Sequence, residues 1–207
     1  MSTKAQNVIE FYLICNKLKD TIRTGWQNWG VHRNRLESVA EHIYGTQMLA
    51  IAIHSEFDYP LDLKKILYML AIHELGEALI GDYTPFEINQ DEKVKLERTA
   101  VHKVLQNLNN YQEIEALFLE FDEHKPPEAK FAFMCDKLES DIQCKLYDNE
   151  HTVDLKKRPY TNALKNPEIQ ELLQNDASWS EIWLKYSQNH NNYDSNFQVI
   201  SDYLLNS

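Results

Sequence analysis

The segment from Leu63 to Ile80 constrains the fold more than any other part of the chain. Apolar residues occupy so much of its helical surface that, as a helix, it must lie at the centre of the molecule. Gly81 predicts the end of this helix. His73 and Glu77 stand four residues apart within it, so they share one helical face. The segment therefore predicts a helical fold whose central helix carries ionisable residues at the spacing of a metal site.

Helical periodicity continues along the rest of the sequence. Ser38 and Glu41 form a Ser-x-x-Glu capping box, which predicts a helix that begins near Val39. Only 5 Gly and 6 Pro leave little turn chemistry for a sheet fold, so an all-α class is expected. The stretch 26–35 is predicted as a loop. One helix is predicted to begin near residue 8 and to end before residue 25. Further helices are predicted over about 39–54, 63–80, 92–108 and 112–123, and another begins near 128. A C-terminal extension over 160–207 is expected to contain helices that start near Pro167 and Asp176–Ser178.

Composition narrows the classes of protein that the chain can belong to. Its 207 residues suffice for one core and include no Pro-, Gly- or Ser-rich linker, so one domain over residues 1–207 is expected. No apolar run reaches the roughly 18 residues of a membrane span, and the first residues lack the apolar core of a signal peptide, which predicts a cytoplasmic protein without a membrane partner. A net charge of −11 disfavours a nucleic-acid polymer as partner, although the local excess of Lys and Arg over residues 17–35 suits a small phosphate ester.

Short motifs surround the central helix. A His-Glu doublet at 73–74 precedes Glu77 and a Gly-Asp pair at 81–82, while Ser-Val-Ala-Glu-His ends at His42, Arg-Thr-Gly-Trp occupies 23–26, and Asp136 stands far downstream. In this order and spacing, the motifs resemble those of the HD-domain phosphohydrolases, in particular the small 5'-deoxynucleotidases. The resemblance covers roughly residues 8–150 and implies an HD-domain helical bundle with extra C-terminal helices. One position departs from the family, whose doublet reads His-Asp.

The resemblance implies one divalent metal ion held by His42, His73, Glu74 and Asp136. Two neutral imidazoles and two carboxylates leave a dication near neutral and able to exchange water, which suits Mn, Co, Zn, Fe or Ni. Glu74 is longer than the family's aspartate by one methylene, which moves the carboxylate outward by about 1.5 Å. Three outcomes are open: the ion shifts and activity persists, the ion binds weakly, or Glu74 swings away. Persistence is the expectation, because the other motifs are intact.

Two further acidic residues are expected to act in catalysis. In the resembling family, the residue at the position of Glu77 is a general acid or base. A purely structural Glu77 is less attractive, because a lone buried charge on an apolar helix is costly. The residue at the position of Asp82 orients the water or contacts the sugar. An aspartate that only initiates a turn is the alternative for Asp82.

Three residues are expected to contact the substrate. Arg23 can bind a phosphate through two hydrogen bonds, and Lys137 can neutralise phosphate charge. Trp26 either stacks on a base or sugar or packs in the core. The remaining tryptophans are assigned to packing, namely Trp29, Trp179 and Trp183.

These expectations favour a metal-dependent phosphomonoesterase acting on nucleoside 5'-monophosphates, with deoxyribonucleotides preferred through the resemblance. Two alternatives stay open. One is hydrolysis of phosphodiesters or pyrophosphates in cyclic nucleotides or alarmones, and the other is a non-catalytic binding protein that keeps the fold. A small nucleotide is the expected partner, and a homodimer follows from the resemblance alone.

Overall fold

The computed structural model describes residues 3–157, 159–174 and 177–207. These parts of the chain are helical, with an isolated antiparallel bridge between Ile22 and Ser38 as their only β pairing. The predicted all-α class is confirmed. The helices are α1 (Lys4–Asn16), α2 (Thr24–Asn28), α3 (Val39–Glu56), α4 (Leu63–Ile72), α5 (Glu77–Ile80), α6 (Gln90–Leu105), α7 (Tyr111–Glu123), α8 (Pro127–Asn149), α9 (Pro167–Gln174), α10 (Trp179–His190) and α11 (Ser195–Asn206), with 3-10 turns η1 (Lys17–Lys19), η2 (Leu155–Lys157) and η3 (Asn162–Lys165).

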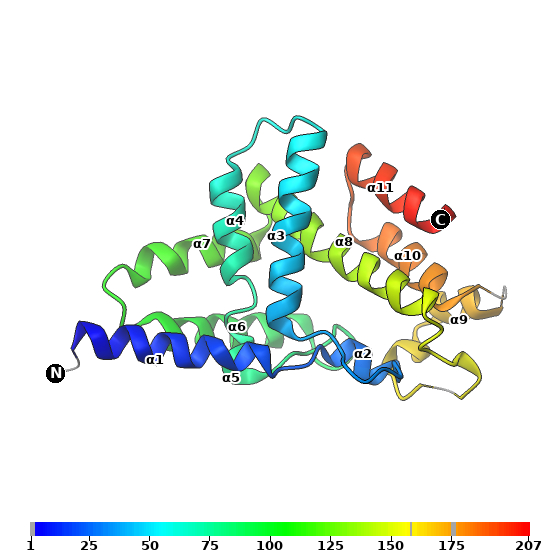
Figure 1. Ribbon diagram of the computed structural model, residues 1–207, viewed down its shortest axis with the longest axis horizontal. Helices are drawn as coiled ribbons and strands as arrows, with labels where there is room; N and C mark the ends of the chain where they lie inside the picture. Colours follow the sequence, from blue (N-terminus) through cyan, green and yellow to red (C-terminus); the bar gives the residue numbers. More distant parts are fainter. Residues whose placement is uncertain (1–2, 158, 175–176) are drawn as a thin grey trace.

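The centre of the molecule is built from α3, α4 and α8. Figure 1 shows α3 and α4 standing side by side with the long α8 crossing behind them, and all three pack against one another. Ile66, Met69 and Leu70 of α4 are completely buried, as expected for an apolar central helix. The helices α1, α5 and α6 lie together at one end of this centre, whereas α9, α10 and α11 lie at the other (Figure 1).

The predicted helix over 63–80 is wrong in one respect, because it is interrupted at 73–76. The helix α4 ends at Ile72 and α5 begins at Glu77. In between, the amides of Leu75 and Glu77 bond to carbonyls three residues back instead of four. A Cβ on Gly76 would lie 3.2 Å from the Glu97 carbonyl oxygen, so the backbone of α6 passes close to this break. The structure therefore places the doublet at the end of α4 and Glu77 at the start of another helix.

One other local expectation differs from the structure. The first helix ends before Gly25 as predicted, at Asn16, but residues 26–28, which were predicted as loop, belong to α2. The Asp82 carboxylate accepts the Thr24 amide at 2.5 Å, so a residue distant in sequence stabilises the start of α2. At the start of α3, both bonds of the predicted Ser38 capping box are present. Of the starts predicted near Asp176–Ser178, Asp176 lies outside the described residues and Ser178 caps α10.

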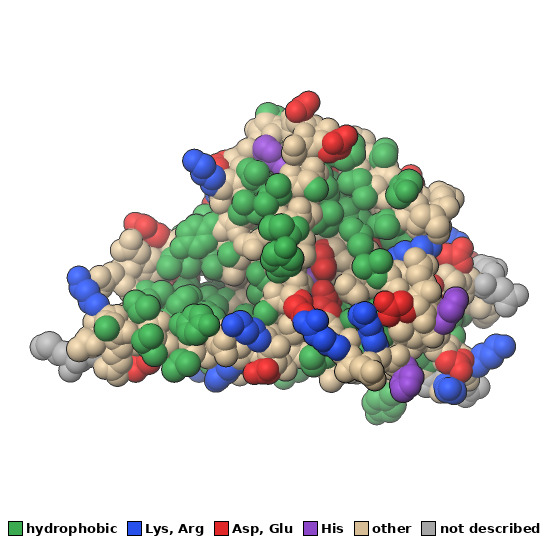
Figure 2. Space-filling model, viewed as in Figure 1, with side chains coloured by type: hydrophobic (Ala, Val, Ile, Leu, Met, Phe, Trp, Pro, Cys, Tyr) green, Lys and Arg blue, Asp and Glu red, His purple; other side chains and the backbone are tan. Residues whose placement is uncertain are grey.

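Apolar side chains also occur on the surface. The helix α1 contains no buried residue, and Val8 and Leu13 are 58% and 57% exposed. Figure 2 shows apolar side chains gathered along α1 and over α3, where Tyr44 is 64% exposed. Among the described residues, no helix is both long and apolar enough to cross a bilayer.

Candidate metal centre and active-site pocket

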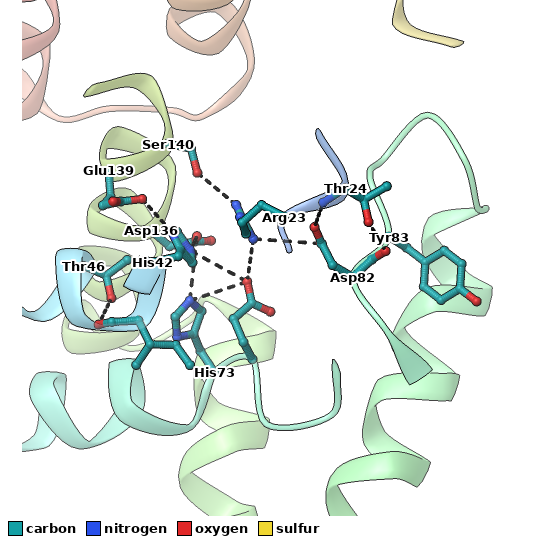
Figure 3. A network of polar contacts seen from close by, with 12 residues as sticks. Arg23, Thr24, His42, Thr46, His73, Asp82, Tyr83, Asp136, Glu139 and Ser140 are labelled. Carbon is teal, nitrogen blue, oxygen red and sulfur yellow. Dashed lines mark hydrogen bonds and ion pairs between the residues drawn. The ribbon is translucent and has the colours of Figure 1, made fainter. Parts of the chain in front are cut away.

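Four ionisable side chains from distant parts of the chain meet at the junction of α3, α4 and α8. They offer ligand atoms that all lie within 4.8 Å of one another, and all four residues are buried. Figure 3 shows the side chains of His42, His73 and Asp136 pointing toward a common point. The outermost two are 94 positions apart in sequence. The structure thus brings together the whole set expected to bind a metal: His42, His73, Glu74 and Asp136.

His73 provides the clearest sign that a cation belongs at this point. Its Nδ1 donates to the Leu70 carbonyl at 2.8 Å, which leaves the lone pair on Nε2. That Nε2 is buried and has no hydrogen-bond partner among the described residues. It lies 3.7 Å from Glu74 Oε1 and 3.8 Å from Asp136 Oδ1. A buried acceptor left unpaired is costly, and a metal ion satisfies a lone pair that faces two carboxylates.

His42 is held by carboxylates on both sides of its ring. Its Nδ1 lies 2.5 Å from Glu139 Oε2, and its Nε2 lies 3.0 Å from Asp136 Oδ1. Burial and the charge of Arg23 lower the pKa of His42, but Glu139 and Asp136 outweigh them and raise it to about 9. A cluster that draws a proton onto a buried imidazole is short of positive charge. A divalent cation can replace that proton, so the residues fit a metal ion.

Glu74 reaches the cluster despite its extra methylene. Its Oε1 lies 3.8 Å from His42 Nε2 and accepts a hydrogen bond of 3.3 Å from Arg23 Nη1. Burial raises the pKa of Glu74, but its interactions with His73 and Arg23 lower it to about 2. The side chain is therefore an ionised oxygen donor at the place where the resemblance implies a ligand.

The Glu77 carboxyl group lies beside the four candidate ligands. It is 2% exposed, and neither carboxylate oxygen has a hydrogen-bond partner among the described residues. Burial raises the pKa of Glu77 well above its ordinary value, and the charges of Glu74 and Asp82 add to this. Its carboxylate lies within 4.8 Å of ligand atoms of Glu74 and Glu97. The arrangement favours a protonated carboxyl group beside the candidate metal centre.

Arg23 lies between the metal cluster and the segment that follows α5. Its Nη2 donates to Ser140 Oγ at 3.1 Å, while its Nη1 lies 3.9 Å from Asp82 Oδ1 (Figure 3). Asp82 also accepts two bonds from Thr24, one from its amide and one from its hydroxyl. Asp82 therefore fixes the short segment that presents Arg23. This contact positions Arg23 whether or not Asp82 also contacts substrate.

Two lysines border the cluster. Lys137 Nζ lies 2.8 Å from Asp136 Oδ2, and its side chain is 38% exposed, so it can reach a ligand in the pocket. Lys93 of α6 donates to the Tyr83 carbonyl at 3.0 Å and lies 3.3 Å from Glu97. Sequence reasoning missed Lys93, because nothing local separates it from the other charges of α6. Only the packing of α6 against α5 brings it to the site.

A pocket of about 240 Å³ extends from this cluster to α10. Trp26 borders it but is only 1% exposed, with its indole N–H bonded to Glu37 at 2.7 Å. The ring of Trp183 stacks on Trp26 with centroids 5.2 Å apart. Trp26 therefore packs in the core, which is one of the two roles that the sequence left open for it. Trp183, assigned to packing from the sequence, is only partly buried and lines the pocket.

Sequence comparison finds relatives that are named 5'-deoxynucleotidases. A 5'-deoxynucleotidase HDDC2 from Dictyostelium discoideum is 36% identical over 152 residues, which are 70% of this chain and 79% of that protein. The 5'-deoxynucleotidase hdd1 from Schizosaccharomyces pombe is 30% identical, with coverage of 72% and 76%.

Solved structures share the fold over nearly the whole chain. A conserved hypothetical protein from Pyrococcus furiosus has a TM-score of 0.64 at 25% identity, covering 96% of this chain and 99% of that one. A protein from Magnetospirillum magnetotacticum MS-1, described as a predicted metal-dependent phosphohydrolase, has a TM-score of 0.61 at 20% identity, covering 98% and 96%. The family model described as HD domain matches residues 15–175. The chain belongs to the HD domain family.

Proposed function

We propose that the protein is a metal-dependent phosphomonoesterase that hydrolyses nucleoside 5'-monophosphates, preferably deoxyribonucleotides, to nucleoside and phosphate. The observation that carries this proposal is the buried, unpartnered His73 Nε2, which faces two carboxylates at one end of a pocket. The relatives from Dictyostelium discoideum and Schizosaccharomyces pombe, both named 5'-deoxynucleotidases, support the substrate class.

The metal ligands would be His42, His73, Glu74 and Asp136. A divalent ion bound there supplies Lewis acidity, which neutralises phosphate charge and lowers the pKa of water. Arg23, fixed by Ser140 and Glu74, offers its guanidinium to the phosphate oxygens. Lys137 adds a second positive charge from α8. Together these groups would hold the phosphate at the end of the pocket that carries Glu74 and Asp136.

Glu77 would manage the proton of the reaction. Because burial raises its pKa, the Glu77 carboxyl group favours the protonated form and would donate to the 5'-oxygen as the P–O5' bond breaks. Charge that develops on the leaving oxygen is then neutralised without help from bulk water. A water molecule would attack phosphorus as the P–O5' bond breaks, and one of its protons would return to the Glu77 carboxylate. The products are the nucleoside, with a free 5'-hydroxyl, and inorganic phosphate.

Purified protein can test the function directly. Phosphate release would be measured from dAMP, AMP, cyclic AMP and an alarmone, with Mn or Co added and with bound metal quantified. We expect dAMP and AMP to be hydrolysed, with dAMP preferred. Faster turnover of cyclic AMP or the alarmone would favour the phosphodiesterase or pyrophosphohydrolase alternative. A metal-loaded protein that turns over none of the four would be a binding protein.

We also propose that residues 1–207 act as one domain. One apolar core cluster joins Ala50 of α3, Leu70 of α4, Leu138 of α8 and Phe197 of α11, so the C-terminal extension shares the central core. Limited proteolysis would test this proposal, since a separate C-terminal domain would be released intact. The cytoplasmic location predicted from the sequence stays a prediction.

A homodimer through the exposed face of α1 and α3 is a further proposal. Val8, Leu13 and Tyr44 are all more than half exposed, and apolar side chains cluster along these helices in Figure 2. Extended apolar surface of this kind is typical of protein contacts. Sedimentation of the wild type and of the double variant Leu13→Glu, Tyr44→Glu would test it. A monomeric wild type contradicts the proposal.

A further inference from the structure

The α8 helix carries a buried carboxyl group that the proposed chemistry does not use. Asp141 is 1% exposed and lines the same pocket as the metal cluster. Its Oδ2 accepts the Tyr193 hydroxyl at 2.8 Å. Its Oδ1 is buried and has no hydrogen-bond partner among the described residues. One oxygen of Asp141 is therefore anchored, and the other is free to accept.

The surroundings of Asp141 compensate its charge only in part. Burial raises its pKa to about 7, although hydrogen bonding by Tyr193, Ser187 and Trp183 and the charge of Lys137 act in the opposite direction. A buried carboxyl group with an unpaired oxygen costs stability, and most native polar groups avoid this state. A hydrogen-bond donor on a ligand in the pocket would satisfy this oxygen.

The position of Asp141 matches the part of a nucleotide remote from its phosphate. It follows the metal-binding Asp136 by five residues, which is a rise of about 7.5 Å along the helix. Beyond this point the pocket is lined by Trp183, Tyr186 and Ser187 of α10 and by Asn191, which follows that helix. A nucleotide whose phosphate lies at Arg23 and Lys137 would extend its sugar and base along α8 toward this wall.

We propose that Asp141 selects the nucleobase, with its free Oδ1 accepting an N–H from the exocyclic amino group of adenine, cytosine or guanine. This inference rests on the proposed nucleotidase function. Adenine and cytosine carry an amino group where thymine and uracil carry a carbonyl oxygen. The N3–H of thymine lies between two carbonyl oxygens, which repel a carboxylate. The aromatic ring of Trp183 supplies a flat apolar contact that every base can use.

Base selectivity in variants of Asp141 tests the proposal. The value of kcat/KM would be measured at pH 8 for dAMP, dCMP, dTMP and dUMP. We expect the wild type to prefer the amino bases by about 10- to 100-fold, the effect of one hydrogen bond to a charged group. Asp141→Leu removes the acceptor, so the preference should vanish. In Asp141→Asn the Tyr193 hydroxyl retains the amide oxygen and the NH₂ faces the base, so the preference should move toward dTMP and dUMP.

Tyr193→Phe is the matched control. It removes the hydroxyl that anchors Oδ2 but leaves Oδ1 in place, so melting temperature should fall while base preference stays. A base preference in Asp141→Leu equal to that of the wild type overturns the proposal, whatever happens to stability. The proposal is also overturned if Asp141→Leu lowers kcat/KM equally for all four nucleotides and the wild type shows the same loss on a substrate without the 3'-hydroxyl. Asp141 would then bind the sugar.

Nucleoside binding separates this proposal from the proposed function. Calorimetry with deoxyadenosine, deoxycytidine and thymidine requires no phosphate, no metal and no turnover. If the protein hydrolyses none of the nucleotides but binds the amino nucleosides more tightly through Asp141, the proposed function fails and the base selectivity stands. If it hydrolyses all the nucleotides without base preference, the base selectivity alone fails.

Discussion

Individual hydrogen bonds determine the protonation and the position of side chains in this site. The Leu70 carbonyl accepts the proton on His73 Nδ1, so Nε2 carries the lone pair that a metal ion would bind. Asp82 similarly anchors the segment that presents Arg23. At this scale the chemistry depends on the protonation and direction of a few atoms, and substitutions that preserve shape can probe it.

Glu77→Gln is expected to abolish most hydrolysis without removing the metal. The amide keeps the size of the side chain but has no proton to give, and loss of a general acid usually costs about 10² to 10⁴ in rate. Phosphate release and metal content measured together would check this outcome. The exposed Glu92→Gln on α6 serves as the control and should behave as wild type. Near-normal turnover in Glu77→Gln would make Glu77 a structural residue.

Glu74→Asp and Glu74→Ala should have opposite effects. Aspartate restores the doublet of the resembling family, so metal affinity and turnover should persist or improve. Alanine removes an ionised ligand and leaves Arg23 without its 3.3 Å partner, so both quantities should fall. Titration with Mn and assays of phosphate release would measure them. Equal losses in both variants would mean that the chain is built around the longer side chain, and no effect in either would exclude position 74 as a ligand.

At the scale of helices, the close approach of α3 to α8 orients His42, one of the four proposed metal ligands. Glu139 of α8 reaches His42 only because α3 carries a glycine where the two helices meet. A Cβ on Gly45 would lie 2.5 Å from Glu139 Oε1. This contact therefore determines which way the His42 ring faces.

Gly45→Ala is expected to weaken metal binding by about 10- to 100-fold, as the loss of a partner behind a histidine ligand does. Calorimetry with Mn would measure the affinity, with Met48→Ala on the exposed face of α3 as control. Glu139→Ala should cause a similar loss. The double variant should lose no more than Glu139→Ala alone, because the new methyl group then meets empty space. Additive losses would contradict this explanation.

Some elements were predictable from sequence and others were not. Local signals identified the start of α3, whose capping box lies within four residues, and periodicity identified the apolar α4. The break after Ile72 was not predictable, because it accompanies the approach of the α6 backbone to Gly76. The motifs suggested the four residues that converge. Partners such as Lys93 and Trp183 depend on packing between distant helices, and no local pattern marks them.

At the scale of the whole molecule, buried carboxyl groups make stability depend on pH. Asp141 has a pKa of about 7 in the folded protein against an ordinary value of 3.8. The folded state thus binds this proton more tightly than the unfolded state does. The contribution to stability is complete below about pH 4 and is lost as the pH rises through 7.

Asp141→Asn isolates this contribution, because asparagine does not titrate. The difference in free energy of unfolding, wild type minus variant, should decrease between pH 4 and pH 8. The total decrease should be about 1.4 kcal/mol for each unit by which the pKa of Asp141 in the folded state exceeds that in the unfolded state. Urea unfolding at several pH values would measure it. A difference between the two proteins that stays constant over this range would show that Asp141 does not titrate as described.

The 94 positions between His42 and Asp136 make a bound ion the equivalent of a reversible crosslink. It would close a long loop and join α3 to α8, as a disulfide would, but with a strength set by the concentration of free metal. Free metal at 100 times its dissociation constant should add about 2.7 kcal/mol to the free energy of unfolding. Melting in a series of Mn concentrations, with Glu74→Ala as the uncoupled control, would reveal this dependence. The heat tolerance of the protein would then follow the metal supply of its surroundings.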